Sequence, residues 1–302
     1  MKIFCSALLV GVLCHGAHGA EPQVKLDRGK DTVRVTIGGN DFAVYNFGHK
    51  LPKPFFSDVR GPGKQAPVLT RSLKDPEDHP HHKGIWLSVD EVNGVKFWAE
   101  KGIIRNDKIQ ILKAAGNPAQ MKVTNQWLGK DGKPEVTEVT TISIFANRVV
   151  AYDITFHAPG KPVTFEDTKE GLFGFRMVNS MREKETGHVQ NAEGKQGTGE
   201  CWGQPSDWID YYGDVAGKTY GVAIFDHPQN LRRSRYHVRN YGLFSISPFG
   251  ERAYTRGKNP SKPVMLKPDG TLHLKYAMYI HAGNTKQSDV AGVYAKYLKS
   301  TQ

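Results

Sequence analysis

Residues 33–45 read VRVTIGGNDFAVY, and this stretch decides the fold class. Residues 33–37 alternate apolar and polar side chains, residues 38–41 (GGND) favour a turn, and residues 42–45 resume an apolar run. Alternation with a period of two places every second side chain on one face of a strand, and a glycine-rich turn between two such runs is typical of a β-hairpin. The stretch therefore predicts two antiparallel strands.

The same strand pattern recurs along the chain, whereas helical periodicity is nearly absent. Further strands are expected at residues 136–145, 149–157, 172–178, 220–225, 243–247 and 272–281. One helix is expected at the C-terminus, with Ser288 as its N-cap and one apolar face made by Val290, Val293, Tyr294, Tyr297 and Leu298. Many strands and few helices predict an all-β protein, a large antiparallel β-sandwich with a short C-terminal helix. Long loops are expected at residues 52–74, 181–208 and 249–262, and such loops often carry functional residues.

The first twenty residues are typical of a signal peptide. Lys2 supplies a positive charge, residues 3–13 form an apolar run too short to span a bilayer, and residues 17–19 (AHG) resemble a cleavage signal. We therefore expect residues 1–20 to be removed, residues 21–302 to form a single β-sandwich domain, and the protein to be periplasmic or secreted. Cys201 would then be the one cysteine of the mature chain, which excludes an internal disulfide.

The chain carries a formal net charge of +11. Lys and Arg are spread along the sequence, with one dense group at Arg232, Arg233 and Arg235. A basic surface attracts acidic glycans and anionic membranes as well as nucleic acids. Because an exported protein seldom meets nucleic acids, we expect no nucleic-acid partner. No second apolar run has the length of a membrane span, so the mature chain is not expected to cross a membrane.

Three histidines stand within four residues in the segment DHPHHKGIW, residues 78–86. Imidazole titrates near neutral pH and is the commonest metal ligand. Pro80 favours an extended or turn conformation, and in an extended segment His79 and His81 would share a face while His82 points the other way. We interpret His79 and His82 as catalytic candidates and His81 as a substrate-binding one, with metal binding or a purely structural role as alternatives. No metal site is assigned, since the run lacks the helical spacing of metalloprotease histidines.

A second group of polar residues follows the apolar run at residues 220–225. Asp226 and a neighbouring histidine stand at the end of this expected strand, and Asn230 follows. His237 and Arg239 are two residues apart, so both would project from one face of a strand. A carboxylate beside an imidazole can orient it and raise its basicity. Asp226 and His237 are therefore catalytic candidates, and Asn230 and Arg239 substrate-binding candidates; the alternative is a polar turn with an exposed strand face.

Indole side chains form a third group. Trp202 and Asp207 lie in the aromatic segment at residues 201–213, and Trp86 and Trp98 lie near the histidines. Tryptophan offers a flat apolar face and one N–H donor, which suits the C–H faces and hydroxyl rims of sugar rings. These four residues are candidates for substrate binding, and the alternative is that the tryptophans fill the core.

Two single residues complete the candidate set. Arg71, in the segment LTRS at residues 69–72, could hold a hydroxyl or a carboxylate. Glu170 lies at the entrance of the apolar strand expected at residues 172–178, where partial desolvation would let it act as an acid or base. The alternative for each is a solvated surface charge.

Several motifs resemble those of a bacterial family labelled PmoA, or "methane oxygenase PmoA", a domain of unknown function. They are Thr70-Arg71-Ser72, Asp78-His79-Pro80-His81-His82-Lys83-Gly84-Ile85-Trp86, Asn93-Gly94, Phe97-Trp98, Lys169-Glu170-Gly171-Leu172, Trp202-Gly203, Asp207-Trp208, Asp210-Tyr211, Ile224-Phe225-Asp226-His227-Pro228 and Tyr241-Gly242-Leu243-Phe244. The resemblance runs from about Val24 to the final helix. Its label does not imply oxygenase chemistry, because a particulate methane monooxygenase subunit has membrane-spanning helices. The all-β pattern is also similar to the supersandwich of galactose mutarotases and several glycan-active enzymes.

These features predict an exported carbohydrate-active protein, an enzyme of the epimerase, lyase or hydrolase class. His79, His82 and His237 would supply acid–base groups, with Glu170 or Asp226 as the carboxylate partner. No cofactor is assigned, and the expected partner is a carbohydrate ligand. A non-catalytic glycan-binding module is the second interpretation, because aromatic side chains alone would satisfy it. A metal-dependent oxidase, suggested by the histidines and the family label, is the third.

Overall fold

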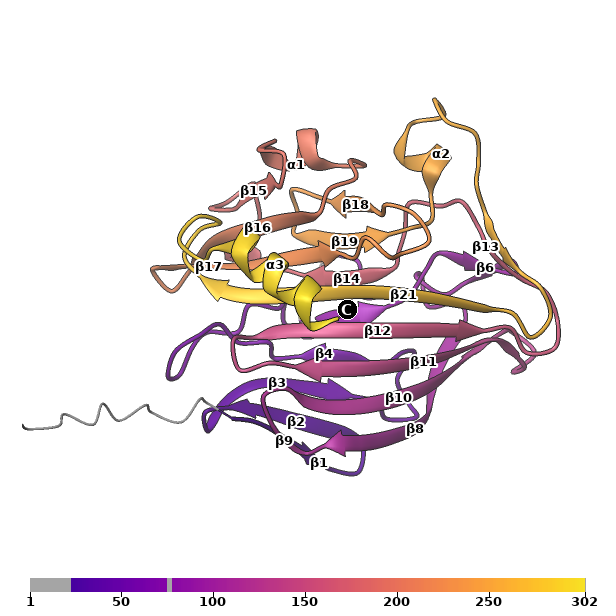
Figure 1. Ribbon diagram of the computed structural model, residues 1–302, viewed down its shortest axis with the longest axis horizontal. Coiled ribbons are helices and arrows are strands. Elements are labelled where there is room, and N and C mark those ends of the chain that lie inside the picture. The colour runs from indigo at the N-terminus through magenta and orange to yellow at the C-terminus, as the bar shows by residue number, and fades with distance from the viewer. Residues whose placement is uncertain (1–22, 75–77, 302) are drawn as a thin grey trace, which may run out of the picture.

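Two large antiparallel sheets, packed face to face, form the body of the protein (Figure 1). The computed structural model describes residues 23–74 and 78–301. The predicted signal peptide, residues 1–20, lies outside the described residues. The predicted antiparallel β-sandwich with a short C-terminal helix is confirmed.

Strand order places segments far apart in sequence beside one another. The nine-stranded sheet has the order β18 (Arg235–Val238), β19 (Leu243–Ser247), β14 (Phe173–Arg176), β5 (Ile85–Leu87), β4 (Phe55–Ser57), β3 (Asn40–Asn46), β2 (Thr32–Ile37), β1 (Val24–Arg28), β9 (Ala115–Gly116). The eight-stranded sheet has the order β15 (His188–Asn191), β16 (Trp208–Val215), β17 (Lys218–Asp226), β21 (Thr271–Ala282), β12 (Val149–His157), β11 (Pro134–Ile144), β10 (Ala119–Leu128), β8 (Ile103–Lys113). A small sheet comprises β20 (Val264–Leu266), β13 (Val163–Phe165), β6 (Glu91–Val92) and β7 (Val95–Lys96). The helical segments are η1 (Asn179–Met181), α1 (Gly197–Cys201), α2 (Glu251–Tyr254) and α3 (Val290–Ser300).

The hairpin predicted from residues 33–45 is formed by β2 and β3. Ile37 pairs with Asn40, so the turn itself is Gly38 and Gly39. Their φ angles of +57° and +78° suit residues without a Cβ atom. Asn40 therefore begins the second strand rather than continuing the turn.

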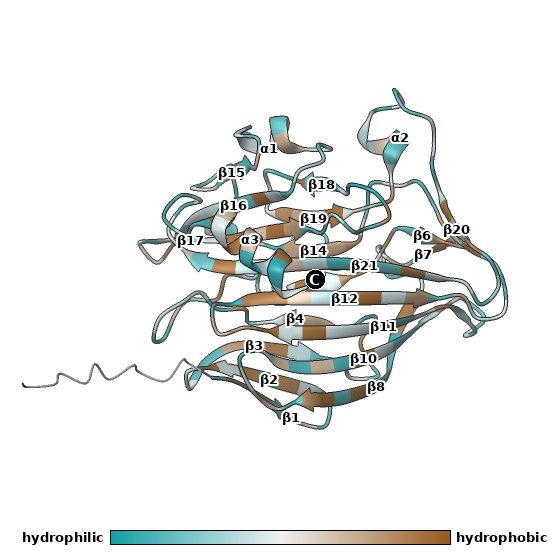
Figure 2. Ribbon diagram, viewed as in Figure 1, coloured by the Kyte–Doolittle hydropathy of each residue, from teal (hydrophilic) through white to brown (hydrophobic). Residues whose placement is uncertain are grey.

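The core lies between the two large sheets. Val33 and Val35 of β2 belong to the same buried cluster as Met121 and Val123 of β10. Apolar and polar residues alternate along the strands (Figure 2), because one face of each large sheet packs into this core. Each strand of the nine-stranded sheet consequently sends alternate side chains to its outer face, the face directed away from the eight-stranded sheet.

Helix α3 packs on the outer face of the eight-stranded sheet (Figure 1). Val290 and Val293 are buried there against Ala223 and Ala277. The N-cap is Asp289, whose carboxylate accepts the backbone N–H of Gly292 at 3.2 Å, so the prediction of Ser288 as the cap was wrong. Among the described residues, no helix combines the length and apolar character needed to cross a bilayer.

A row of buried polar side chains interrupts the apolar alternation on three neighbouring strands. Asn106 of β8 donates to Asn125 of β10, and Asn125 donates to the carboxylate of Glu138 on β11. Glu138 also accepts the indole N–H of Trp127 at 2.9 Å and the hydroxyl of Thr140 at 2.7 Å. These bonds offset part of the desolvation of Glu138, whose pKa is nonetheless raised by burial.

Candidate functional site

One row of residues crosses the outer face of the nine-stranded sheet. Phe55, Trp86, Gly174, Ser245 and His237 are successive partners on β4, β5, β14, β19 and β18. Their neighbours along each strand belong to the core, so these five residues point outward. The register therefore brings an indole and an imidazole from positions 86 and 237 onto one surface.

Gly174 makes room for the indole of Trp86. A Cβ atom at position 174 would lie only 2.8 Å from Cζ2 of Trp86. The indole of Trp86 therefore extends over β14 toward Ser245. Any side chain at position 174, on the strand between them, would block it. Both the indole N–H of Trp86 and the hydroxyl of Ser245 are buried and have no hydrogen-bond partner among the described residues. Buried polar groups of this kind require a partner such as water or a ligand.

Four rings stack in a column beside this row. Tyr241 lies on His79, His79 on His82 and His82 on Trp86, with centroid distances of 5.1, 4.8 and 5.5 Å and interplanar angles of 3°, 4° and 18°. Trp98 packs edge-on against His82 at 5.4 Å. Histidines and aromatic residues of separate segments thus form one packed cluster, in which His82, Trp86 and Trp98 are buried.

The histidine segment forms a turn rather than an extended strand. The backbone N–H of His82 donates to the carbonyl of His79 at 2.9 Å, closing a turn through Pro80 and His81. Of the extended and turn conformations that Pro80 favoured, the turn is the one formed, so His79 stacks on His82. The ring of His81 lies edge-on to His79 at 5.7 Å. Residues three apart meet because the chain reverses between them.

Two arginines fix the column through one carboxylate. Asp78 accepts from the guanidinium of Arg71 and twice from Arg176, at 2.6 and 2.9 Å. Burial acts to raise the pKa of Asp78, but the hydrogen bond and charge of Arg176 and the charge of Arg71 outweigh it and lower that pKa. Arg71 also donates to the carbonyls of Asp78 and His79. The turn is consequently tied to β14 as well as to its own segment.

His82 is held as a neutral hydrogen-bond donor. Arg176 lies 3.3 Å from Nδ1 of His82, and a guanidinium only donates, so Nδ1 accepts and Nε2 carries the hydrogen. That Nε2–H group is buried and has no partner among the described residues. Burial, followed by the nearby charges of His81 and Arg176, holds the pKa of His82 far below its usual value. His82 and Trp86 therefore offer two adjacent unsatisfied donors.

His81 has a different environment at the edge of the column. Its carbonyl accepts from the buried ammonium of Lys53 at 2.7 Å, and Lys53 also bonds Glu100 at 2.7 Å. Lys83 forms a second ion pair with Glu100. Burial and the positive charge of Lys53 lower the pKa of His81 to about 4. The group fixes the backbone of the turn from the side opposite Arg71.

His237 is oriented as a base. Its Nδ1 lies 3.1 Å from the carbonyl of Lys169 and 3.5 Å from the carboxylate of Glu170. Both partners only accept, so Nδ1 carries the hydrogen and Nε2 keeps a lone pair. Burial lowers the pKa of His237 to about 4, although the charge of Glu170 acts in the opposite direction. Glu170, rather than Asp226, is thus the carboxylate beside this imidazole.

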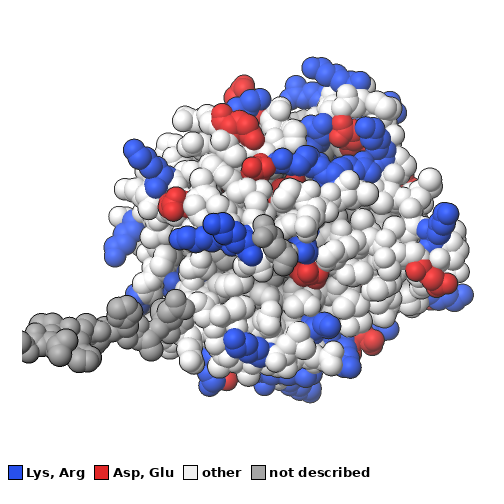
Figure 3. Space-filling model, in the orientation of Figure 1, with Lys and Arg blue, Asp and Glu red and all other residues white. Residues whose placement is uncertain are grey.

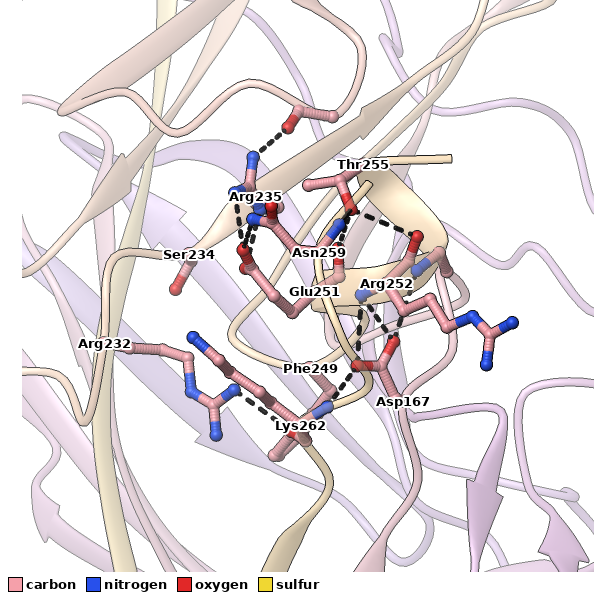
Figure 4. Close-up of polar contacts among 12 residues, drawn as sticks. Asp167, Arg232, Ser234, Arg235, Phe249, Glu251, Arg252, Thr255, Asn259 and Lys262 are labelled. Carbon is pink, nitrogen blue, oxygen red and sulfur yellow. Dashed lines mark hydrogen bonds and ion pairs between the residues drawn. The ribbon is translucent and has the colours of Figure 1, made fainter. Parts of the chain in front are cut away.

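The loop that carries α2 supplies a wall next to His237. The ring of Tyr254 lies edge-on to His237 at 6.3 Å, and its hydroxyl donates to the carbonyl of Lys169 at 2.5 Å. Figure 4 shows how this loop is held: Asp167 accepts three backbone N–H groups of the loop, and Glu251 accepts from the guanidinium of Arg235. Tyr254 is therefore fixed by polar contacts on both sides of α2.

Several predicted site residues lie together on the outer side of the nine-stranded sheet. They are Arg71, His79, His81, His82, Trp86, Trp98, Glu170, Trp202, His237 and Arg239. Of these, Arg71, His82, Trp86, Trp98 and His237 are buried. Trp86 and Trp98 pack in an apolar cluster with Phe55 and Leu243, as the core-filling alternative expected. Trp202 stands edge-on to His237 at 6.2 Å, and the guanidinium of Arg239 lies 5.7 Å from the ring of Tyr241. Cys201 is buried, and burial raises the pKa of its thiol to about 11. A thiol in this state is a poor nucleophile.

Asp226, Asn230 and Asp207 are not brought into this group. Asp226 lies at the end of β17 in the eight-stranded sheet and accepts from Asn230 and from the backbone N–H and hydroxyl of Ser234. Asp207 pairs with Arg233 at 2.8 Å. These contacts hold the loop after β17. Asp226, Asn230 and Asp207 therefore have a structural role, separate from His79, His82 and His237.

We expect Asp226→Asn to lower stability without affecting turnover per folded molecule. An asparagine amide placed among donors cannot accept all their hydrogen bonds, and leaving buried groups unsatisfied costs about 1–3 kcal/mol. Urea unfolding would measure the loss, and kcat of the folded fraction would be compared with that of the parent. A fall in kcat of tenfold or more with unchanged unfolding would instead make Asp226 catalytic.

Three buried or half-buried imidazoles predict acid sensitivity. The pKa values of His81, His82 and His237 are lower in the folded protein than the usual value near 6.5. Below that value the unfolded chain binds protons that the folded chain excludes. Stability is thus greatest above about pH 6.5 and falls toward pH 4, by at most about 1.4 kcal/mol per pH unit for each group.

This dependence is measured by urea unfolding at pH 7.5, 6.0 and 5.0. The variant His237→Gln should show a smaller loss of unfolding free energy between pH 6.0 and 5.0 than the parent, because one of the three groups is gone. Equal slopes for parent and variant would contradict the assignment.

No three His, Cys, Asp or Glu side chains in residues 23–74 and 78–301 form a group that could hold a metal ion. The rings of His79 and His82 lie face to face, and their flanking neighbours are aromatic rings. The described site groups its imidazoles with guanidinium groups and with the carboxylates of Asp78 and Glu170.

Sequence reasoning did not name Asp78, Arg176, Tyr241, Ser245 or Tyr254 as site candidates, although Asp78 and Tyr241 stood in the quoted motifs. Arg176 interrupts the apolar run at residues 172–178, and a lone arginine in such a run signals a buried charge that needs a partner. Tyr241 and Tyr254 gave no such signal, because they contact the histidines only through the fold.

Comparison with known proteins gives a family and a set of distant structures. The sequence profile of a family of unknown function (DUF6807) matches residues 32–295. No curated protein matches the chain by sequence. The match does not test the resemblance to the PmoA-labelled family, which stays a prediction.

Among solved structures, the chain is similar to galactose 1-epimerase from Lactobacillus acidophilus, with 9% identity and a TM-score of 0.45 over 87% of this chain and 98% of that one. It is similar to an α-galactosidase from Geobacillus stearothermophilus, with 10% identity and a TM-score of 0.47 over 87% of this chain and 41% of that one. A polysaccharide lyase gives 10% identity and a TM-score of 0.35, over 87% of this chain and 33% of that one.

Proposed function

The chain belongs to DUF6807, a family of unknown function, and from its site geometry we propose that it is an exported carbohydrate-active enzyme. Its acid–base residues would be those on the outer face of the nine-stranded sheet. The substrate would lie beside Trp202, whose indole is partly exposed and stands edge-on to His237 at 6.2 Å.

The observation that carries this proposal is the fixed orientation of the imidazole of His237. His237 has its Nδ1–H directed at the carbonyl of Lys169, which leaves Nε2 as a proton acceptor. Ser245, its cross-strand partner, has an unsatisfied hydroxyl. A base and a neighbouring hydrogen-bond donor are the minimum for moving a proton while stabilising the negative charge that develops on oxygen.

The surroundings of these imidazoles suit a sugar. Trp202 is partly exposed and provides a flat apolar face beside His237, whereas Trp86 and Trp98 are buried in an apolar cluster. The indole N–H of Trp86 and the hydroxyl of Ser245 are unsatisfied hydrogen-bonding groups. Sugar rings combine apolar C–H faces with a rim of hydroxyl groups. Aromatic walls with a few convergent polar atoms are the usual composition of a small-molecule site.

The mechanism that this arrangement supports begins with proton removal. Nε2 of His237 takes a proton from a hydroxyl or an acidic carbon of the sugar, and the nearby carboxylate of Glu170 stabilises the imidazolium that results. The oxygen that gains negative charge accepts a hydrogen bond from the unsatisfied hydroxyl of Ser245, the cross-strand partner of His237. Epimerisation, elimination and hydrolysis all contain such a step.

The second candidate function is non-catalytic glycan binding, favoured by the stacked aromatic column. A binding module does not need a base, so the orientation of His237 by Lys169 and Glu170 would serve no catalytic step. We therefore place non-catalytic binding second. A metal-dependent oxidase finds no three-ligand group within the described residues.

The proposal is tested by incubating the purified protein with a glycan library and following anomer exchange, new reducing ends and unsaturated products by NMR. Calorimetry with the same glycans measures binding separately. We expect at least one glycan to be both bound and converted. Binding of glycans with no conversion of any of them would favour the non-catalytic module, and no binding at all would overturn both candidate functions.

A further inference from the structure

A basic pocket opens beside Trp202. It has a volume of about 380 Å³ and is lined by Thr198, Gly199, Trp202, Val238, Arg239, Asn240 and Arg256. Its walls come from three separate segments: α1 with the residue after it, the turn between β18 and β19, and the loop that follows α2. Lys and Arg also gather on the surface near α2 (Figure 3).

The two arginines of this pocket lack carboxylate partners. The guanidinium of Arg256 lies 5.5 Å from the ring of Trp202, and that of Arg239 lies 5.7 Å from the ring of Tyr241. Among the described residues neither arginine forms an ion pair, whereas Arg235, Arg233 and Arg176 each pair with a carboxylate. Arg239 also has a side-chain hydrogen bond to Tyr241. An arginine held on an aromatic face without a carboxylate partner is suited to binding carboxylate, phosphate or sulfate.

Trp202 connects this pocket to the acid–base residues. Its indole lines the pocket and stands edge-on to His237 at 6.2 Å. Its N–H group is buried and has no partner among the described residues, so it is a third donor near the two guanidinium groups. A group bound in the pocket would therefore lie one indole ring away from the imidazole of His237.

We propose that this pocket binds an anionic substituent, a carboxylate or a sulfate, of a saccharide whose sugar ring lies over His237. The substrate class is thus an acidic glycan. The position of the sugar ring in this inference rests on the proposed function. The acidic class of the substrate is inferred from the positive charge of the pocket.

The test uses matched pairs of glycans that differ only in charge. Oligosaccharides of uronic acids are compared with their methyl esters, and sulfated oligosaccharides with their desulfated forms, on an array and then by calorimetry. We expect the bound members to be anionic, and affinity to fall as NaCl is raised from 50 to 300 mM because salt screens exposed charges. Preference for the carboxylate pairs or for the sulfate pairs identifies the substituent.

Variants locate the anion in the pocket. Arg239→Gln and Arg256→Gln should each weaken binding of the anionic glycan about 10- to 100-fold, since each removes a charge-assisted contact. Arg252→Gln is the matched control: Arg252 is exposed on α2, its replacement removes the same charge, and it does not line the pocket. Its affinity should remain within about twofold of the parent.

The outcomes separate this inference from the proposed function. Equal affinity for charged and neutral members, with both pocket variants unchanged, would overturn the pocket assignment, and conversion of those glycans would leave the enzyme proposal standing. Anionic glycans that bind through Arg239 and Arg256 but are never converted would support the pocket and overturn the enzyme. Failure of every glycan to bind would overturn both.

Discussion

Replacement of His237 by glutamine is expected to lower kcat by about 10²- to 10⁴-fold, while the dissociation constant for the glycan changes by less than threefold. Lys169 and Glu170 hold Nδ1 of this imidazole, and this contact fixes the orientation of the ring. Nε2, on the other side of the ring, is therefore a proton acceptor with a fixed direction. Glutamine can keep the hydrogen bond to the carbonyl but cannot take a proton. The change is measured by steady-state kinetics on the glycan that the parent converts, with calorimetry for binding.

The control for this variant is His188→Gln. His188 is an exposed histidine on β15, so its replacement should leave kcat within about twofold of the parent. A kcat for His237→Gln within threefold of the parent would exclude His237 as the base. Glu170→Gln should lower kcat less than His237→Gln does, because Glu170 does not take the proton itself and only stabilises the imidazolium of His237.

Replacement of Asp78 by asparagine is the change with the largest expected effect on the architecture of the site. Asp78 accepts hydrogen bonds from Arg71 and Arg176, and both guanidinium groups are buried. An asparagine leaves two buried cations without a counter-charge. Loss of a hydrogen bond to a charged group costs about 1.5–3 kcal/mol, which for a chain of this length lowers Tm by roughly 3–5 °C. Because Arg176 also fixes Nδ1 of His82, the packing of the ring column should change as well.

Differential scanning calorimetry and near-ultraviolet circular dichroism measure these effects, the second because it reports the packing of the stacked rings. Asp27→Asn is the matched control. Asp27 forms an exposed ion pair with Lys25, and such pairs contribute about 0–1 kcal/mol. If Asp78→Asn were no more destabilising than Asp27→Asn, Asp78 would not be what holds the column together.

Much of the sandwich could be predicted from alternation alone. The hairpin of β2 and β3 was found because Val33, Val35 and Ile37 point to the core while Arg34 and Thr36 do not. Strands β8 and β10 were not found, because Asn106 and Asn125 occupy buried positions where the pattern requires apolar residues. Their burial depends on Glu138, a partner on another strand, and so no local pattern reveals it.

Only part of the site could be predicted, because some of its contacts also join residues far apart in the sequence. The three closely spaced histidines identified the histidine segment as a candidate site. Its ring column, however, includes Tyr241, which lies more than 150 residues away. Asp226 attracted attention as a carboxylate beside a histidine at a strand end, yet its oxygens are used by Asn230 and Ser234. Adjacency in sequence at the end of a strand gives no information on which face a side chain takes. Glu170, which stands before β14 without an adjacent histidine, is the carboxylate that meets His237.

The missing side chain at position 174 has a consequence for how related proteins diverge. The indole of Trp86 occupies the space that a Cβ atom there would need, 2.8 Å away. An alanine or serine at 174 is therefore tolerable only together with a smaller residue at 86, so the two positions should change as a pair across an alignment. Relatives that carry a side chain at 174 and a smaller residue at 86 would pack this part of the outer face differently, and aligned sequences of the family would show whether the two positions change together.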